Sequence, residues 1–191
     1  MSTLTWERRV CDLPAPPKIN SGIDAVADAF MGLWRRRGLL EVLRRNAEQA
    51  EAMGAEFAQL SEAVLARRLE DLRAVFRRGR DVDARLPEAL AAVREIAARQ
   101  LGMRPFFVQL LGALALQRGL LAEMATGEGK SLTAALAATL AGWTGRPCHV
   151  VTVNDYLAER DAARFQPLYR ACGLTAGHVS GPMAAPERTR G

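Results

Sequence analysis

A glycine-rich turn between an apolar run and an alanine-rich segment constrains this chain more than any other feature. The run Leu120 to Ala125 leads into Thr126-Gly127-Glu128-Gly129-Lys130-Ser131, and a helix is expected from Lys130 to Gly142. The two glycines let the backbone turn tightly, so that successive amides and the positive N-terminal end of the helix face one phosphate group. The turn matches the second half of a Walker A loop, with Met124 where the first glycine usually stands.

Each polar side chain of this loop has an expected role. Lys130 is expected to reach the β and γ phosphates of a nucleotide, and the Ser131 hydroxyl to ligate Mg²⁺. All but two of the 26 basic residues are arginine, and Lys18 is the other lysine. The alternative is a glycine turn that contains Gly-Lys-Ser by chance, but the flanking strand and helix favour phosphate binding. Glu128 is expected to face solvent, in preference to a catalytic role.

Apolar, β-branched runs alternate with helical segments after Gly119. Such alternation predicts an α/β fold in which a parallel sheet is flanked by helices. The sequence reaches Gly191 before a complete doubly wound sheet could be built, so the sheet is expected to be incomplete. The expected strands are Leu120 to Ala125, His149 to Val153 and Leu174 to Val179, and the expected helices are Lys130 to Gly142 and Asp155 to Cys172.

The first half of the chain is expected to be helical, because its apolar residues recur at intervals of three and four. Residues 1 to 20 contain three prolines and are expected to form an irregular arm. We expect two parts, an arm with basic amphipathic helices over 1–54 and the start of a nucleotide-binding domain over 55–191. Helical character is expected from Ser21 onward, with a break at Gly38. Three further helices are expected, from Phe57 to Phe76, from Pro87 to Leu101 with Gly102 as the stop, and from Phe106 to Gln117.

Composition and charge bound the environment of the chain. The net charge of +5 is compatible with nucleic acid, anionic lipid or an acidic protein as partner, and does not choose among them. The longest nearly apolar stretch, Leu132 to Trp143, is too short to span a membrane, and Met1 to Asp12 lacks the apolar core of a signal peptide. A cytosolic location is therefore the default expectation. The three cysteines have no paired spacing and are interpreted as reduced thiols.

Three blocks of sequence, in this order, resemble the first nucleotide-binding domain of the SecA preprotein translocase ATPase family. They are Met103-Arg104-Pro105-Phe106-Phe107-Val108-Gln109-Leu110-Leu111-Gly112, then Ala122 to Ser131, and then Val150-Val151-Thr152-Val153-Asn154-Asp155-Tyr156-Leu157-Ala158-Glu159-Arg160-Asp161. The resemblance is strong over Leu101 to Gly181 and weaker over Ala55 to Gln100. It implies N-terminal helices followed by an incomplete P-loop, RecA-like motor domain, with ATP and Mg²⁺ as cofactors. By resemblance, the ATP-binding residues are Arg104, Gln109, Thr126, Gly127, Glu128, Gly129, Lys130 and Ser131, with Ser131 also the metal ligand.

The block before the loop implies an adenine site. The resemblance assigns Gln109 to adenine contact and places Arg104 and Pro105 at the base pocket. Without the resemblance, Gln109 would be interpreted as a polar residue on the exposed edge of an apolar helix. Phe107 departs from the family, which commonly has an acidic residue there, and this departure concerns the fine structure of the base pocket.

The third block separates two classes of motor. Helicases of this superfamily usually carry a Pro-Thr-Arg-Glu-Leu type sequence that grips nucleic acid, whereas this chain has Thr152-Val153-Asn154-Asp155-Tyr156-Leu157. Nucleic acid is therefore not the expected partner, although a helicase lobe remains the alternative enzyme. Asp155 could be mistaken for a Walker B aspartate, but helix capping by Asn154 or Asp155 is the preferred interpretation.

The resemblance implies a motor that couples ATP hydrolysis to moving preproteins through a Sec-type membrane channel. It also implies contact with acidic phospholipid and a cytoplasmic location, peripheral to the membrane. Phe30, Met31, Leu33 and Trp34, beside Arg35 to Arg37, could supply the membrane contact, or their helix could dock on its own domain.

No Walker B carboxylate, catalytic glutamate or second-lobe arginine is identifiable before Gly191, so no catalytic residue is expected in this chain and it is expected to hydrolyse ATP poorly alone. We therefore expect a fragment, a truncated gene product, or half of a split motor whose second lobe comes from another chain. A degenerate interaction module that binds no nucleotide is the alternative that is not an enzyme.

Overall fold

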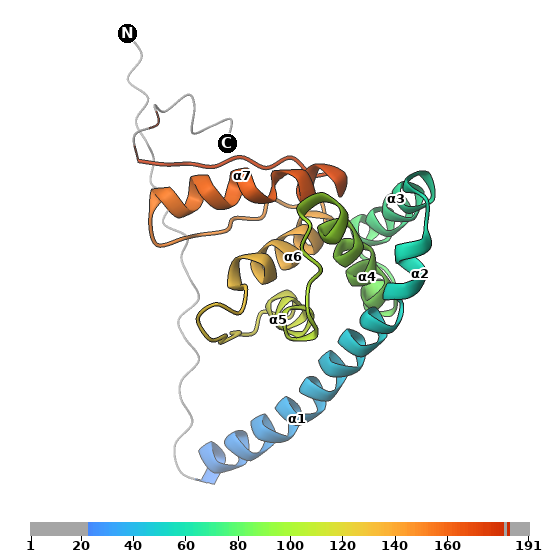
Figure 1. Cartoon of the computed structure of the whole chain (residues 1–191). Coiled ribbons are helices and arrows are strands. Elements are labelled where there is room, and N and C mark those ends of the chain that lie inside the picture. The colour runs from blue at the N-terminus through green and yellow to red at the C-terminus, as the bar shows by residue number, and fades with distance from the viewer. Residues whose placement is uncertain (1–22, 182, 184–191) are drawn as a thin grey trace. The chain divides into compact units, whose positions relative to one another are not determined.

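The computed structural model describes residues 23–181 and 183, and within them the chain folds into α-helices joined by turns and extended loops (Figure 1). It divides into two units, Met1–Leu39 and Leu40–Gly191. The division inferred from the sequence, at residues 54 and 55, stays a prediction. The helices are α1 (Ile23–Ala52), α2 (Gly54–Gln59), α3 (Glu62–Arg78), α4 (Val82–Leu101), α5 (Phe107–Gln117), α6 (Lys130–Gly142) and α7 (Asp155–Ala171).

Helix α1 continues through Gly38, where a break was expected, so that expectation is wrong. A single glycine inside a helix costs only about 1 kcal/mol relative to alanine, and no neighbouring group crowds this position. The expected arm over residues 1–20 lies outside the described residues. The same holds for the side chains of residues 1–37, and with them for the proposed membrane-contacting group at Phe30 to Arg37.

The long amphipathic helix expected over residues 57–76 is two helices, α2 and α3. Leu60 adopts an extended conformation with ψ of 136°, and the Ser61 hydroxyl accepts a hydrogen bond from the Val64 amide at 3.4 Å, which caps the start of α3. The apolar period continues across the junction, so it did not reveal the break. Gly79 ends α3 with a φ of +68°, as its position in the sequence predicted.

Helix α4 begins at Val82, earlier than the expected start at Pro87, and ends at Gly102 as expected. Proline is favoured in the first helical turn, but here the turn at Asp81 starts the helix and Pro87 lies buried in its second turn. Most of α4 is buried, and the helix contacts α2, α3, α6 and α7. Helix α4 therefore forms the centre of the core of the second unit.

Helices α5 and α6 pack closely and carry the glycine loop between them. A side chain at Gly112 would lie 2.8 Å from the Thr133 methyl group, so this glycine permits the close approach of the two helices. Trp143, directly after α6, is buried, contacts Phe76 of α3 edge to face at 5.5 Å, and donates to the Cys172 carbonyl at 2.9 Å. These contacts fix the C-terminal end of α6 against α3 and the end of α7.

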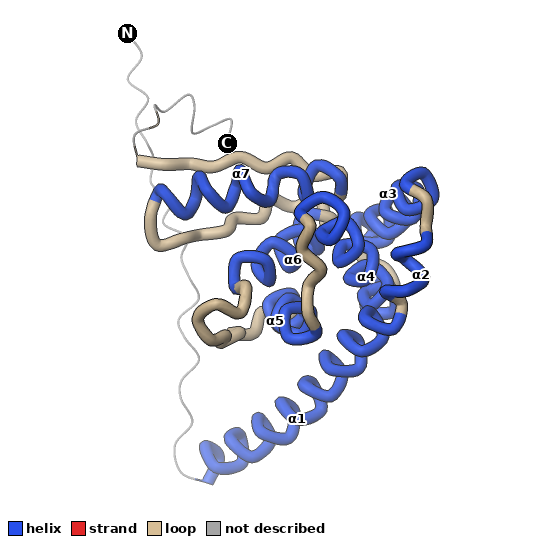
Figure 2. Tube along the Cα trace, in the orientation of Figure 1, coloured by secondary structure: helices blue, strands red, loops and turns tan. Residues whose placement is uncertain are grey.

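The three expected strands are not formed in the described part of the chain, which contains no strand (Figure 2). Residues 120–125, 149–153 and 174–179 are extended loops, and Leu121, Val151 and Val153 are 90% to 96% exposed. A run of apolar, β-branched residues favours burial, but a strand also needs a neighbouring strand that supplies a ladder of backbone hydrogen bonds. No such ladder joins these three segments to one another.

Two of these extended segments run along α7, one before it and one after it (Figure 2). The segment from Arg146 to Val150 stands away from α6 and leaves an open cavity of about 560 Å³. Its walls include Ala134, Ala137, Ala138 and Ala141 of α6. In the described residues, none of the helices has the length and apolarity required to cross a bilayer.

Candidate phosphate-binding site

The glycine loop forms a compact turn that ends at the first residue of α6. Gly127 and Gly129 have φ angles of +90° and +82°, a region in which a residue with a side chain is strained. The Glu128 amide closes the turn on the Ala125 carbonyl at 3.3 Å. Helix α6 begins at Lys130 as predicted, and the amides of its first turn have no carbonyl one turn earlier within the helix. The loop therefore presents backbone donors at the positive end of a helix.

Polar side chains of the loop bond to the loop's own backbone. The Lys130 ammonium donates to the Ala125 carbonyl at 2.9 Å, and the Glu128 carboxylate accepts from the Ala125 amide at 3.2 Å. Both side chains and that of Thr126 are exposed. The loop thus keeps its cation at the surface, where a phosphate could replace the carbonyl as its partner.

Ser131 is joined to α7 by a hydrogen bond that the sequence did not predict. Its hydroxyl donates to one oxygen, Oδ2, of Asp161 at 3.0 Å. The other oxygen, Oδ1, accepts from Arg160 at 2.9 Å and 2.6 Å. The side chain of Asp161 is only 20% exposed. Asp161 lies at the end of the third sequence block, but nothing in the sequence indicated its contact with Ser131, 30 positions away.

Gln109 lies at the start of α5 and is only 7% exposed, not at an exposed helix edge. Its amide oxygen accepts from the Phe106 amide at 3.0 Å, and its amide nitrogen donates to the Glu128 carbonyl at 2.8 Å. A side chain added at Gly129 would collide with the Gln109 amide group. Gln109 therefore supports the glycine loop directly, and it still has one N–H and one oxygen lone pair for a ligand.

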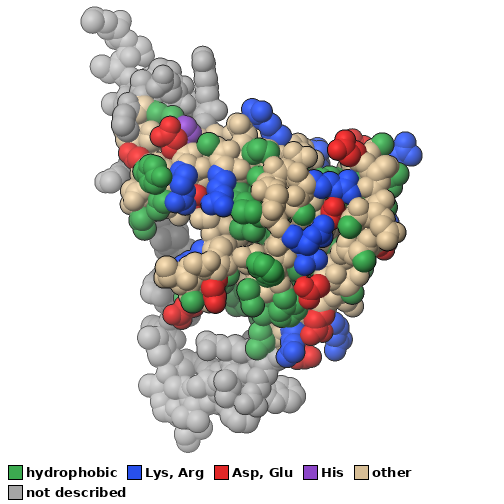
Figure 3. Space-filling model, viewed as in Figure 1, with side chains coloured by type: hydrophobic (Ala, Val, Ile, Leu, Met, Phe, Trp, Pro, Cys, Tyr) green, Lys and Arg blue, Asp and Glu red, His purple; other side chains and the backbone are tan. Residues whose placement is uncertain are grey.

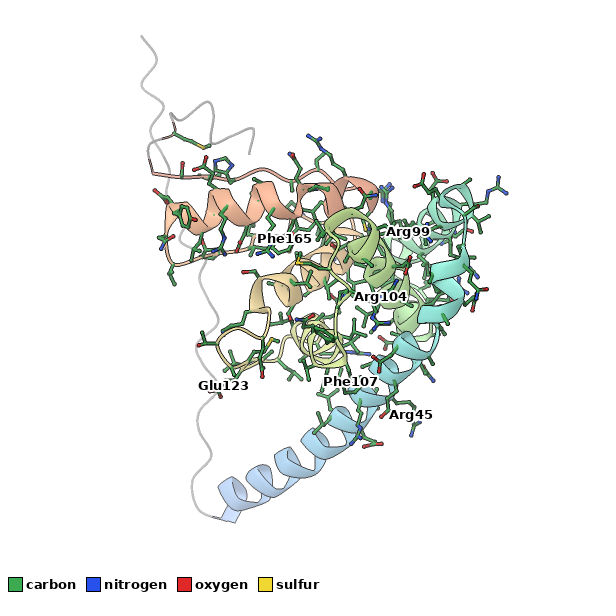
Figure 4. The ribbon with its side chains drawn as sticks, in the orientation of Figure 1. Arg45, Arg99, Arg104, Phe107, Glu123 and Phe165 are labelled. Carbon is green, nitrogen blue, oxygen red and sulfur yellow. The ribbon has the colours of Figure 1, made fainter. Side chains whose placement is uncertain are left out.

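Arg104 does not bond to the loop in the described structure, but pairs with Glu95 of α4 at 2.7 Å. Glu95 also accepts from Arg99 at 2.8 Å, and its side chain is 5% exposed. Arg99 in turn donates to the carbonyls of Phe57 and Leu60, at the end of α2. Figure 4 labels Arg99 and Arg104, which lie near the end of α4. No sequence pattern predicted this cluster.

A third arginine, Arg94, is buried beside this cluster. It donates to the Pro105 carbonyl at 2.8 Å and lies 3.5 Å from the Glu51 carboxylate. Burial lowers the pKa of the Arg94 guanidinium, and the nearby Glu51 charge opposes that effect. Its guanidinium also lies so close to Gly54 that a side chain there would collide with it. These contacts tie the segment before α5 to the end of α1.

The helix cap that was expected in the third sequence block is formed by Asn154. Its side chain accepts from the Leu157 amide at 2.9 Å and caps α7. The neighbouring Asp155 accepts from the Gly181 amide at 2.9 Å and so joins the start of α7 to a later segment. Both residues therefore act at a helix terminus, and neither contacts the glycine loop through a recorded hydrogen bond.

The family model described as the SecA DEAD-like domain matches residues 29–191. The chain thus belongs to the SecA DEAD-like domain family. A DEAD-like domain implies a RecA-like α/β fold, of which the described residues supply the helices. Membership confirms the resemblance read from the three blocks and places the chain in a family of protein translocase motors.

Curated relatives agree with this assignment. The chain is 45% identical to protein translocase subunit SecA 2 of Magnetococcus marinus over 94% of its length, and 45% identical to the SecA 2 subunit of Chlorobium chlorochromatii over 92%. It is 44% identical to protein translocase subunit SecA of Rubrobacter xylanophilus over 79%. It covers 28%, 27% and 17% of these three proteins, so it spans about a quarter or less of their length.

Proposed function

We propose that this chain is the nucleotide-binding segment of a SecA-type motor and binds ATP with Mg²⁺ at Thr126 to Ser131. The observation that carries the proposal is the loop itself, with two left-handed glycines leading into α6 and an exposed lysine at the first helical position. Backbone donors, one cation and one hydroxyl form a donor set suited to a phosphate chain and its magnesium ion. The residues present therefore fit the cofactors that the family implies.

In this proposal each residue of the loop has a distinct role. The amides around Gly127 and Gly129 hold the phosphate oxygens, and Lys130 exchanges the Ala125 carbonyl for the β and γ phosphates. Ser131 supplies an oxygen to Mg²⁺, which neutralises phosphate charge when bound. Thr126 and Glu128 line the loop without taking part in chemistry.

The base of the nucleotide is proposed to bind near Gln109. The unused N–H and lone pair of its amide match the acceptor and donor on one edge of adenine. Arg104 is proposed to line the same pocket. Because Arg104 is 44% exposed and held by Glu95, it could approach a ligand while keeping this ion pair.

The work of the whole protein is a further part of the proposal. We assign to it the coupling of ATP hydrolysis to preprotein translocation through a Sec-type channel, at the cytoplasmic face of a membrane with acidic phospholipid. No catalytic residue is assigned to this chain. The carboxylates that organise magnesium and water are proposed to come from other parts of a longer protein or from a second chain. The exposed apolar runs at 120–125, 149–153 and 174–179 are proposed to join a parallel sheet with those parts.

The nucleotide proposal is tested by titrating the purified chain with a fluorescent ATP analogue, with and without Mg²⁺. We expect saturable binding that Mg²⁺ strengthens. Lys130→Ala should weaken it at least tenfold, because the only lysine of the loop is lost. Lys18→Ala removes the other lysine and serves as the matched control.

Equal binding by the wild type and Lys130→Ala would contradict the proposal. So would the absence of saturable binding by a folded chain, which would favour a module that keeps the fold without a nucleotide.

A further inference from the structure

Asp161 of α7 meets the glycine loop at the one side chain that is expected to touch magnesium. The Ser131 hydroxyl and the Asp161 carboxylate are joined at 3.0 Å although 30 positions separate them in sequence. Helix α7 lies beside α6 in the fold (Figure 1). Both side chains are partly buried. The contact is therefore part of the packing between the two helices.

The direction of this hydrogen bond leaves Ser131 able to act as a metal ligand. A serine hydroxyl has one hydrogen and two lone pairs. By accepting the hydrogen, the carboxylate turns the lone pairs away from α7 and increases the electron density on the oxygen. Partners that orient a ligand in this way raise the affinity of a site for its metal without touching the ion.

The Asp161 carboxylate is itself held in place. One of its oxygens, Oδ1, accepts two hydrogen bonds from Arg160, at 2.9 Å and 2.6 Å, and the other, Oδ2, is left for Ser131. The Arg160 guanidinium also lies over the Tyr156 ring, 6.0 Å from its centre. A series of side-chain contacts thus links the exposed face of α7 to the loop, through Tyr156, Arg160, Asp161 and Ser131.

Resting on the proposed binding of a magnesium nucleotide, we propose that Asp161 is a positioning residue for Ser131. It accepts the hydroxyl hydrogen and aims the Ser131 oxygen at Mg²⁺. It acts on the metal and not on the base or the phosphates. Its removal therefore lowers the affinity of the nucleotide site for magnesium. Nucleotide binding in the absence of magnesium stays unchanged.

The test is a magnesium titration of the full chain at a fixed concentration of a fluorescent ATP analogue. Asp161→Ala, which removes the acceptor, should raise the magnesium concentration at half-saturation about 10-fold to 100-fold, the usual effect of losing such a partner. Its affinity for the analogue in the presence of a chelator should equal that of the wild type. Glu159→Gln, which removes an exposed carboxylate of the same helix, is the matched control and should leave the midpoint unchanged.

A double-mutant cycle separates positioning from a general effect on folding. Ser131→Ala should raise the magnesium midpoint as Asp161→Ala does, and adding Asp161→Ala to Ser131→Ala should change it no further. Should Asp161→Ala fail to fold, Asp161→Leu, which also lacks an acceptor, answers the question in the same cycle. Additive shifts in the cycle would overturn the proposal.

The outcomes also distinguish this inference from the proposed function. An unchanged magnesium midpoint in a folded Asp161→Ala chain, with Lys130→Ala still losing affinity, overturns the role of Asp161 alone. A lowered midpoint overturns it too, because Asp161 would then hold the hydroxyl away from the metal. Nucleotide binding that is insensitive to Lys130→Ala removes the proposed function, and this inference with it.

Discussion

The ionic cluster around Glu95 and the glycine loop around Glu128 use similar groups for opposite purposes. Each has a glutamate that accepts hydrogen bonds and a cation that donates to backbone carbonyls. The Glu95 side chain is 5% exposed and serves two arginines, whereas Glu128 lies in an exposed turn. The first region joins helices, whereas the charged side chains of the second bond to the backbone of their own turn.

Burial explains the difference in what these regions can do. A charge held away from water cannot lose its partners without a large cost in free energy, so the cluster at Glu95 fixes the ends of α2 and α4. At the loop, water can replace each internal hydrogen bond of Lys130 or Glu128 at little cost. The loop can therefore exchange its internal partners for a ligand, and the cluster cannot.

The largest expected effect is a difference in the free energy of unfolding between variants of Glu95 and variants of Glu128. Glu95→Ala should lower the free energy of unfolding by about 2 to 4 kcal/mol, because it leaves Arg99 and Arg104 without their shared partner. Solvent partly screens Arg104, which keeps the loss below that of a fully buried pair. Glu128→Ala should lower the free energy of unfolding by less than about 0.5 kcal/mol. Urea unfolding followed by circular dichroism measures both.

A control for lost packing is Glu95→Gln, which keeps the size of the side chain. It should still destabilise the chain by more than Glu128→Gln does. Equal effects at the two positions would show that burial does not separate the two regions.

A smaller effect is expected from pH, and it concerns the core alone. Burial raises the pKa of the Cys172 thiol from 9.0 to about 12, an effect that the nearby Arg73 partly offsets, and burial also raises the pKa of Tyr169 to about 12. A group whose pKa is raised by folding stabilises the fold below its unfolded pKa, and that contribution is lost as the pH rises towards its folded pKa. Stability should therefore fall by about 1 kcal/mol per pH unit between pH 9 and 10, mainly through Cys172.

Urea unfolding at pH 8, 9 and 10 measures this slope. Cys172→Ala should flatten it, while Cys148→Ala, at an exposed thiol, should not. A slope that is unchanged in Cys172→Ala would contradict the assignment.

Local signals predicted the helices of the loop region well. The alanine-rich segment after the glycines became α6 with the expected bounds, and Asn154 caps α7 as expected. These features depend on residues that are adjacent in sequence. The break between α2 and α3 at Ser61 was missed because the apolar period continues across it.

Features that depend on distant partners were not predictable from the sequence. The strand character of residues 149–153 is clear in the sequence, but no ladder forms in the described part of the chain. The contacts of Asp161 with Ser131, and of Glu95 with Arg104, join residues that only the packing of helices and loops brings together. Glycine spacing located the loop, and packing alone determined which side chains support it.

Hydrogen–deuterium exchange across the loop tests the central claim, that residues 126–131 bind a magnesium nucleotide. With saturating ATP and Mg²⁺, peptides covering Thr126 to Leu132 should exchange more slowly, while the segment around Glu95 should be unchanged. The Lys130→Ala chain should show no such protection under the same conditions. Exchange in the loop that is the same with and without nucleotide, in a folded wild-type chain, would contradict the account.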